Sequence, residues 1–141
     1  MAELHPPALD DYGLLAALRT YAEFFSAGAG IRIAVNGEDL VRRQSPIVEM
    51  AMFRVAQEAL ANAAKHARAQ RIEVTLASTP DKVTISDDGT GFDTRRADTA
   101  GVSWGLTIIP ERAEAIGARL RIESEPGRGT RVVVEVAPET A

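Results

Sequence analysis

Apolar and polar residues alternate along several short stretches of the chain, and apolar residues recur at helical spacing along three others. Alternation places successive side chains on opposite faces of a strand, whereas a spacing of three and four places them on one face of a helix. The predicted order is helix, strand, helix, strand, strand, helix, strand, strand, over residues 11–26, 31–35, 46–67, 72–76, 82–86, 106–116, 120–123 and 130–136. This order favours a two-layer α/β sandwich, in which helices cover one face of a mixed, mainly antiparallel sheet.

Residues that start and stop elements support these ranges. Ser45 followed by Pro46 is a favourable helix start, because serine caps exposed N–H groups and proline fits the first helical turn. Gly28 and Gly30 predict the end of the first helix, and Gly117 predicts the end of the last. Turns are expected at residues 36–37, 78–81 and 126–129.

Size and composition restrict the class of protein. The chain has 141 residues, of which 45% are hydrophobic and 26% charged, the balance of one ordinary globular domain. The net charge of -4 argues against nucleic acid or an anionic membrane as the main partner. Cysteine is absent, which excludes disulfides, thiolate zinc sites and cysteine nucleophiles. The sequence has neither an apolar run of membrane-spanning length nor a signal-peptide core.

The strand at 82–86 leads into a carboxylate that its alternation turns inward. Val83 and Ile85 face the core, so Asp87 continues on the same face, where an unpaired carboxylate would be costly. Gly89 and Gly91 follow, and they permit close approach to the backbone or a positive φ. These features suggest a pocket for a ligand that donates hydrogen bonds, such as an adenine amine. An ordinary Asp-Gly hairpin turn explains the segment equally well.

The helix at 46–67 carries four polar residues on one face. Glu58, Asn62, Lys65 and His66 stand at positions i, i+4, i+7 and i+8. Carboxylate and amide oxygens suit a hydrated Mg²⁺, and the ammonium and imidazole groups can contact phosphate. Taken by itself, the pattern is more typical of a solvated helix face.

A third segment, Gly101 to Leu106, forms a glycine-bracketed entry into the last long helix. Backbone N–H groups at such an entry favour anions such as phosphate. The spacing fits neither the P-loop nor the dinucleotide fingerprint, so the sequence argues against both of those classes.

Together these segments resemble the catalytic ATP-binding domain of bacterial sensor histidine kinases, within the GHKL ATPase superfamily. Residues 57–67 resemble the N box, residues 87–91 match its D-x-G-x-G box, and Gly105-Leu106 with residues 127–130 match the later glycine motifs. The resemblance covers residues 45–136 and implies the GHKL fold. The segment 4–14 resembles the one that precedes this domain in nitrate-sensing and membrane-fluidity-sensing kinases.

The resemblance implies roles at the phosphate end of a nucleotide. Glu58 would be the catalytic residue, polarising a Mg²⁺-bound water or the attacking group. Asn62 would bind Mg²⁺ directly, and Lys65 and His66 would lie against the phosphates.

It also implies roles at the adenine end. Asp87 would accept from the adenine amine, Gly89 and Gly91 would admit the base and the lid, and Thr130 would support the base through water. A short lid over residues 92–104 would close on the nucleotide. Its hinges and the helix entry beyond it would be Gly101, Gly105 and Leu106.

The resemblance predicts a division of labour among domains. Residues 1–10 would be a linker from a dimerisation and phosphoacceptor module, 11–137 the catalytic domain and 138–141 a tail. The domain would use ATP and Mg²⁺ to phosphorylate a histidine on that separate module, which serves a cognate response regulator in two-component signalling. We expect this piece to be monomeric and cytoplasmic, from a parent that is cytoplasmic or anchored in the inner membrane.

Two other functions fit parts of the pattern. A stand-alone anti-sigma-factor serine kinase, acting as a switch, shares the nucleotide motifs. The linker-like 4–14 segment and the helix sequence at 111–113 favour the histidine kinase instead. A degenerate domain kept as a scaffold is disfavoured, because the polar and glycine residues of the implied site are all present.

Overall fold

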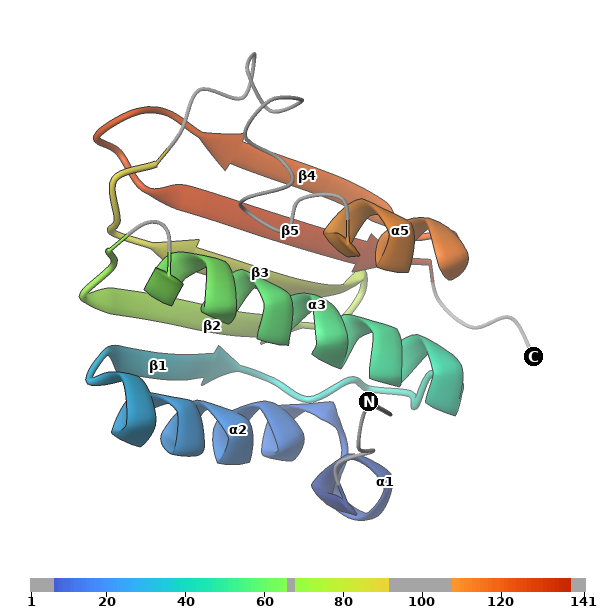
Figure 1. Ribbon diagram of the computed structural model, residues 1–141. Coiled ribbons are helices and arrows are strands. Elements are labelled where there is room, and N and C mark those ends of the chain that lie inside the picture. Colours follow the sequence, from blue (N-terminus) through green and yellow to red (C-terminus); the bar gives the residue numbers. More distant parts are fainter. Residues whose placement is uncertain (1–6, 66–67, 92–107, 138–141) are drawn as a thin grey trace.

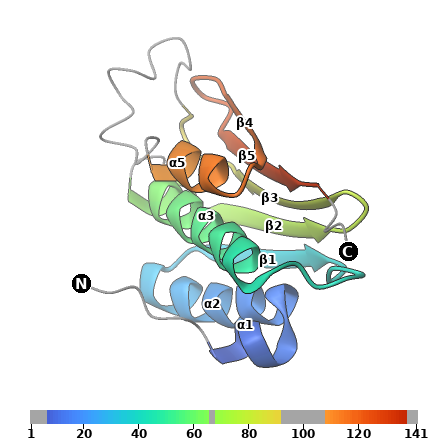
Figure 2. The ribbon, with the colours of Figure 1, turned by 90° about the vertical axis from the view of Figure 1, so that its right-hand side faces the viewer.

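The computed structural model describes residues 7–65, 68–91 and 108–137. In it, a five-stranded sheet has helices on one of its faces (Figure 1). The helices are α1 (Pro7–Tyr12), α2 (Leu14–Ala29), α3 (Pro46–Lys65) and α5 (Ile108–Ala115). The strands are β1 (Arg32–Gly37), β2 (Arg71–Ala77), β3 (Asp81–Asp87), β4 (Arg119–Ser124) and β5 (Thr130–Val136). Viewed along the sheet, α2, α3 and α5 lie side by side in one layer (Figure 2).

The sheet has the strand order β1-β2-β3-β5-β4. β1 runs parallel to β2, and the other three pairings are antiparallel. The predicted fold class, a mixed and mainly antiparallel sheet covered on one face by helices, is confirmed. One end of the sheet holds the last residues of β3 and β4 and the first residues of β2 and β5. The helix α3 also ends there (Figure 1).

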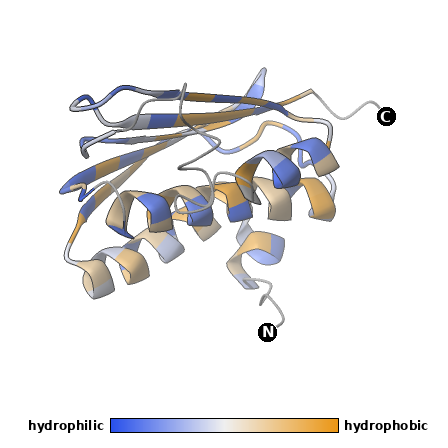
Figure 3. Cartoon of the chain, turned by 45° about the horizontal axis from the view of Figure 1, so that its top comes forward, coloured by the Kyte–Doolittle hydropathy of each residue, from blue (hydrophilic) through white to orange (hydrophobic). Residues whose placement is uncertain are grey.

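The core lies between the inner face of the sheet and the helices. Alternate residues of the strands are buried there, which gives the strands their banded hydropathy in Figure 3. The middle of α3 is buried over most of its circumference, since α2, α5 and the sheet all contact it. The buried residues of the central strands and α3 include Ile72, Val74, Leu76, Val83, Ile85, Val132, Val134, Met52, Phe53, Val55, Ala59 and Leu60.

The predicted helix boundaries at α3 and α5 have the expected physical causes. Ser45 Oγ accepts a hydrogen bond from the Val48 N–H at 3.3 Å, so the predicted N-cap is confirmed. Pro110 falls in the first turn of α5, where its missing N–H costs nothing. Gly117, just beyond α5, has a φ of 65°, the left-handed conformation that ends a helix.

The helix predicted at 11–26 is confirmed from Leu14 onward, but its predicted start is wrong, because two helices, α1 and α2, meet at Gly13. Gly13 has a φ of 92°, and a Cβ there would lie 2.6 Å from the Asp39 carboxylate. Asp39 instead accepts from the Leu15 N–H at 3.4 Å, near the start of α2. A residue distant in sequence thus supplies the acceptor that glycine lacks, and the periodicity of the helix could not reveal it.

The turn predicted at Asn36-Gly37 is also wrong. Both residues belong to β1 and pair in parallel with β2, opposite Thr75 and Leu76. A Cβ at Gly37 would lie 1.9 Å from the Leu76 carbonyl oxygen. The glycine therefore permits a close approach of the two backbones at the end of β1. In the sequence, an Asn-Gly pair with this role looks the same as one in a hairpin turn.

The domain division at residue 10 stays a prediction. In the structure, residues 7–10 belong to α1, and Leu9 is 1% exposed within the core. Among the helices that the structure describes, none is both long and apolar enough to cross a bilayer.

Candidate functional site

The inner face of the sheet changes from apolar to polar at the end where α3 stops. Residues paired across the strands share a face, and one such row joins Val74, Ile85, Val132 and Ile122. The next and last row joins Ile72, Asp87, Thr130 and Ser124. Three neighbouring strands thus place polar side chains together on the face that elsewhere forms the core.

Asp87 is half-buried at the centre of this row. Its Oδ1 accepts from the Gly89 N–H at 2.8 Å, which closes a tight Asx turn. Burial raises the pKa of Asp87, while hydrogen bonds from the backbone N–H groups of Gly89 and Thr130 oppose that rise. These donors provide the partner that an inward carboxylate requires, and they leave further lone pairs on the two oxygens as acceptors for a ligand.

The alternative of an ordinary hairpin turn at residues 87–91 is wrong. β3 already pairs with β2 on one side and β5 on the other, so no further strand can continue from it as a hairpin partner. The loop instead packs on the β4–β5 connection, where Gly127 N–H donates to the Thr90 carbonyl.

Two glycines permit this packing. Gly91 has a φ of 66°, and a Cβ there would lie 2.1 Å from the Glu125 carbonyl oxygen. Gly129 has a φ of 78°, and its Cβ would lie 2.1 Å from the Asp87 carbonyl oxygen. Backbone contact within the protein therefore accounts for Gly91, and its role in admitting a ligand stays a prediction, as does that of Gly89.

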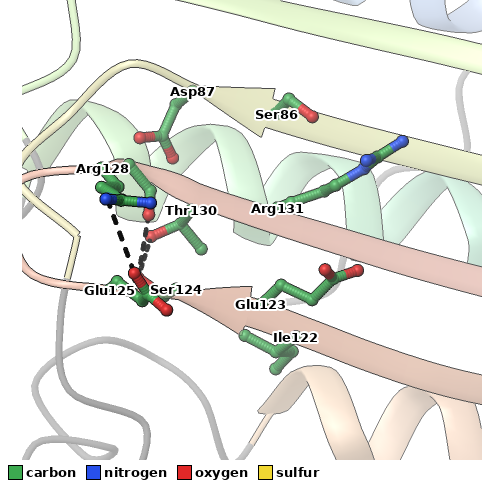
Figure 4. Close-up of a pocket in the computed structure, with 10 residues that line it drawn as sticks. Ser86, Asp87, Ile122, Glu123, Ser124, Glu125, Arg128, Thr130 and Arg131 are labelled. Atoms are coloured by element: carbon green, nitrogen blue, oxygen red, sulfur yellow. Dashed lines mark hydrogen bonds and ion pairs between the residues drawn. The ribbon is translucent and has the colours of Figure 1, made fainter.

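Ser124 completes the row and was missed by the sequence interpretation. Its Oγ lies 3.0 Å from the Gly129 carbonyl oxygen and 2.8 Å from Thr130 Oγ1. Ser124, Thr130 and Asp87 are among the ten residues that line an open cavity of about 650 Å³ at the end of the sheet (Figure 4). Its lining also includes Ser86, Arg131 and Glu123, which form the next row on the opposite face of the sheet, and no residue of α3. The alternation of Leu120 and Ile122 continues to Ser124, so the argument that singled out Asp87 could have found it.

Asp88 fixes the end of β3 to the start of β2. Its Oδ1 accepts from the backbone N–H groups of Gln70 at 2.9 Å and Arg71 at 3.0 Å. Both hydrogen bonds lower the pKa of Asp88, and the one from Gln70 has the larger effect. Because the Ala69 N–H donates to the Ala63 carbonyl, the same connection also holds the last turn of α3. The neighbouring aspartates thus have different roles: Asp87 faces inward, and Asp88 holds the backbone in place.

The polar face of α3 ends beside this row. Glu58 and Asn62 are half-buried and Lys65 is exposed, so their polar groups remain accessible. The charge of Glu58 also reaches the phenol of Tyr21 on α2, whose pKa is raised first by burial and then by that carboxylate. Lys65 lies where α3 ends, at the same end of the domain as Asp87 and Thr130 (Figure 1), whereas Asn62 and Glu58 lie about one and two turns earlier on the helix. That these three side chains share one site with Asp87 stays a prediction.

Part of the predicted site lies outside the described residues. This holds for the lid at 92–104 and for four of the predicted ligand-binding residues. They are His66, Gly101, Gly105 and Leu106.

The sequence matches a family of known domains over most of its length. Residues 47–140 match the family described as histidine kinase-, DNA gyrase B- and HSP90-like ATPases. The chain is 38% identical over 136 residues to the oxygen sensor histidine kinase NreB of Staphylococcus carnosus, covering 95% of this chain and 39% of that protein. It is 37% identical over 137 residues to the histidine-protein kinase/phosphatase DegS of Bacillus subtilis, covering 93% and 36%. The chain thus spans under two fifths of these relatives.

Solved structures have the same fold. The histidine kinase domain of a blue-light activated kinase of Erythrobacter litoralis aligns with a TM-score of 0.70 at 23% identity, covering 87% of this chain and 60% of that one. The ATP-binding domain of PrrB from Mycobacterium tuberculosis aligns with a TM-score of 0.69 at 20% identity, covering 87% and 92%. At these identities the likeness concerns the fold alone.

Proposed function

Since the chain belongs to the histidine kinase-, DNA gyrase B- and HSP90-like ATPase family and is an ATP-binding domain of the histidine kinase type, we propose that Asp87 and Thr130 bind the adenine base of ATP. We further propose that the bound Mg·ATP donates its γ-phosphoryl group to a histidine on a separate helical domain. Two relatives named as histidine kinases support this reaction. This chain covers 39% of the one and 36% of the other, so each relative has further chain that could carry a separate acceptor domain.

The position of Asp87 is the observation that carries the adenine assignment. The carboxylate lies at the end of an otherwise apolar face and accepts from two backbone N–H groups. An exocyclic amine supplies the kind of donor that its remaining lone pairs can accept. The row before it, Ile85 and Val132, is buried in the core, so the carboxylate borders the apolar interior of the domain.

The phosphates would then extend toward the end of α3. Glu58 and Asn62 present a carboxylate and an amide oxygen one helical turn apart, and hard oxygen ligands in this number suit a Mg²⁺ that keeps its waters and binds phosphate. When bound, Mg²⁺ neutralises phosphate charge. Asn62 would hold the ion, Glu58 would orient a water or the attacking group, and exposed Lys65 would contact phosphate oxygens.

The partners follow from the proposed reaction. The phosphoryl acceptor would be a histidine on a dimerisation domain of the parent kinase, and that domain would serve a cognate response regulator. The domain would contribute positioning and charge neutralisation to transfer, with no covalent intermediate of its own.

Phosphotransfer to the parent's helical domain, supplied in trans, tests this proposal. Glu58→Ala and Asn62→Ala should keep most of the affinity for ATP measured without Mg²⁺ and lose at least about tenfold in Mg²⁺-dependent transfer. Asn36→Ala, an exposed asparagine on β1, is the control and should change neither quantity. Full transfer by both α3 variants would overturn the metal site. ATP binding with no transfer to any histidine would favour the anti-sigma-factor alternative.

A further inference from the structure

Two hydroxyl groups and one carbonyl oxygen meet at the start of β5. Ser124 Oγ lies 3.0 Å from the Gly129 carbonyl oxygen and 2.8 Å from Thr130 Oγ1 (Figure 4). Both distances are within the normal range for hydrogen bonds between oxygen atoms. Ser124 is the last residue of β4, Gly129 immediately precedes β5 and Thr130 begins it, so these bonds join the two strand ends at the site.

Both bonds can form together in only one arrangement of protons. A carbonyl oxygen can only accept, so the contact with Gly129 requires the hydroxyl of Ser124 to donate its single proton there. The contact between Ser124 and Thr130 then requires the Thr130 hydroxyl to donate to Ser124 Oγ. Thr130 Oγ1 is thereby left with lone pairs alone, and it can only accept from a ligand or a water.

This matters because Thr130 lies directly opposite Asp87 in the β3–β5 register. The ionised carboxylate of Asp87 is also purely an acceptor. Asp87 and Thr130 therefore present two neighbouring acceptors, and the Thr130 hydroxyl proton is not directed to the ligand.

We propose that Ser124 is a specificity-determining residue, which selects a 6-aminopurine over a 6-oxopurine by holding the Thr130 hydroxyl proton away from the ligand. The inference rests on the proposed binding of adenine at Asp87. A 6-amino group donates, whereas the 6-oxo group of inosine or guanine accepts and meets the two acceptors. Without the Ser124 hydroxyl, the Thr130 hydroxyl can turn and donate to a 6-oxo group, either directly or through a water bound to that group.

A purely structural role for Ser124 predicts something different. The bond to Gly129 also holds the β4–β5 connection, so a loss of stability alone does not distinguish the two roles. Selectivity between bases does, because loosening the turn weakens both nucleotides, whereas a freed Thr130 proton improves only the 6-oxo ligand.

Calorimetric titration with ATP and with inosine triphosphate supplies this measurement. The two nucleotides differ at the 6-position and at the proton on N1. In the wild type ATP should bind more tightly, and in Ser124→Ala the ratio of the two affinities should fall about tenfold, the size of one hydrogen bond to a partner of the wrong polarity. Ser124→Thr, which keeps the donating hydroxyl, should restore the ratio.

Repeating the Ser124→Ala substitution in a Thr130→Val variant shows whether Ser124 acts on base selectivity through Thr130. In Thr130→Val there is no hydroxyl to orient, so adding Ser124→Ala should leave the ratio unchanged. A tenfold fall in that background, or an unchanged ratio for Ser124→Ala alone, would overturn the role of Ser124. If Ser124→Ala does not fold, Ser124→Cys, with a thiol that donates only weakly, replaces it with the same expected direction. A wild type that binds neither nucleotide would contradict the proposed function instead.

Discussion

The carbonyl oxygen of Asp87 lies 2.1 Å from the position that a Cβ of residue 129 would occupy. Real Cβ atoms do not approach backbone oxygen so closely, so the contact between the end of β3 and the start of β5 requires glycine at position 129. The same contact sets Asp87 opposite Thr130. The geometry of the proposed adenine site thus depends on a residue that offers no side chain to the ligand.

Replacing Gly129 by alanine should damage both the fold and the site. The clash and the positive φ should together lower the free energy of unfolding by about 3 kcal/mol and weaken ATP binding. Gly127→Ala is a matched control, since Gly127 has a φ of 81° against 78° for Gly129 but has nothing within 4 Å of its Cβ position. It should cost only the backbone strain, about 1 kcal/mol. Equal effects in denaturant unfolding would refute the close contact.

Arg43 and Glu49 join α1 to the start of α3. The Arg43 guanidinium binds the Glu49 carboxylate through Nε at 2.9 Å and Nη2 at 2.8 Å, and Nη2 also donates to the Leu9 carbonyl at 2.9 Å. Glu49 is 1% exposed, whereas the side chain of Arg43 is 51% exposed. The buried carboxylate also accepts from the Gln44 N–H at 2.9 Å. A buried charge thus depends on a partner that reaches it from the surface.

Arg43→Ala should therefore destabilise the domain without weakening the nucleotide site directly. Removing one partner of a buried ion pair typically costs about 3 kcal/mol or more, because the other charge stays buried. Urea unfolding of Arg43→Ala should show a loss near the lower end of that range. Arg42→Ala, at the exposed neighbouring position, should change stability by less than about 0.5 kcal/mol. A similar loss in both variants would contradict the assigned ion pair.

The raised pKa of Asp87 predicts a specific dependence of stability on pH. Burial makes the folded protein hold the carboxyl proton more tightly than the unfolded chain, whose carboxyl has the ordinary pKa of about 4. In ligand-free protein, the free energy of unfolding should therefore fall as the pH rises from about 4 through the raised pKa of the folded state. It should then level off.

The matched comparison is with Asp87→Asn, which has no proton to release at this position. Unfolding of the two proteins at a series of pH values gives the difference between them. The wild type should lose stability relative to Asp87→Asn across this window. A difference that is constant, or that rises with pH, would mean that the pKa of Asp87 is not raised.

The fold and the central part of the site were predictable because they follow from short-range patterns. The alternation of Val83 and Ile85 was enough to place Asp87 on the inner face, and Ser45-Pro46 was enough to start α3. The errors arose where a distant segment decides the local structure. Asp39 accepts from the Leu15 N–H just after the break between α1 and α2 at Gly13, and the parallel pairing with β2 extends β1 through Asn36-Gly37.

Contacts between backbone atoms were equally hidden from the sequence. Gly91 suggested space for a ligand, but in the structure the Glu125 carbonyl oxygen occupies the space of its missing Cβ atom. The orientation of the Thr130 hydroxyl depends on Ser124 of the neighbouring strand, and only the register brings these two residues together.

Calorimetric titration of a non-hydrolysable ATP analogue into the wild type, Asp87→Asn and Asp88→Asn tests the central claim most directly. Asp88 accepts both of its backbone hydrogen bonds on Oδ1, an oxygen that asparagine keeps, so Asp88→Asn should bind like the wild type. Asp87→Asn should remain folded and lose most of its affinity, at least about a hundredfold, because its amide donors would face those of the adenine amine. Unchanged binding by folded Asp87→Asn would contradict the adenine site.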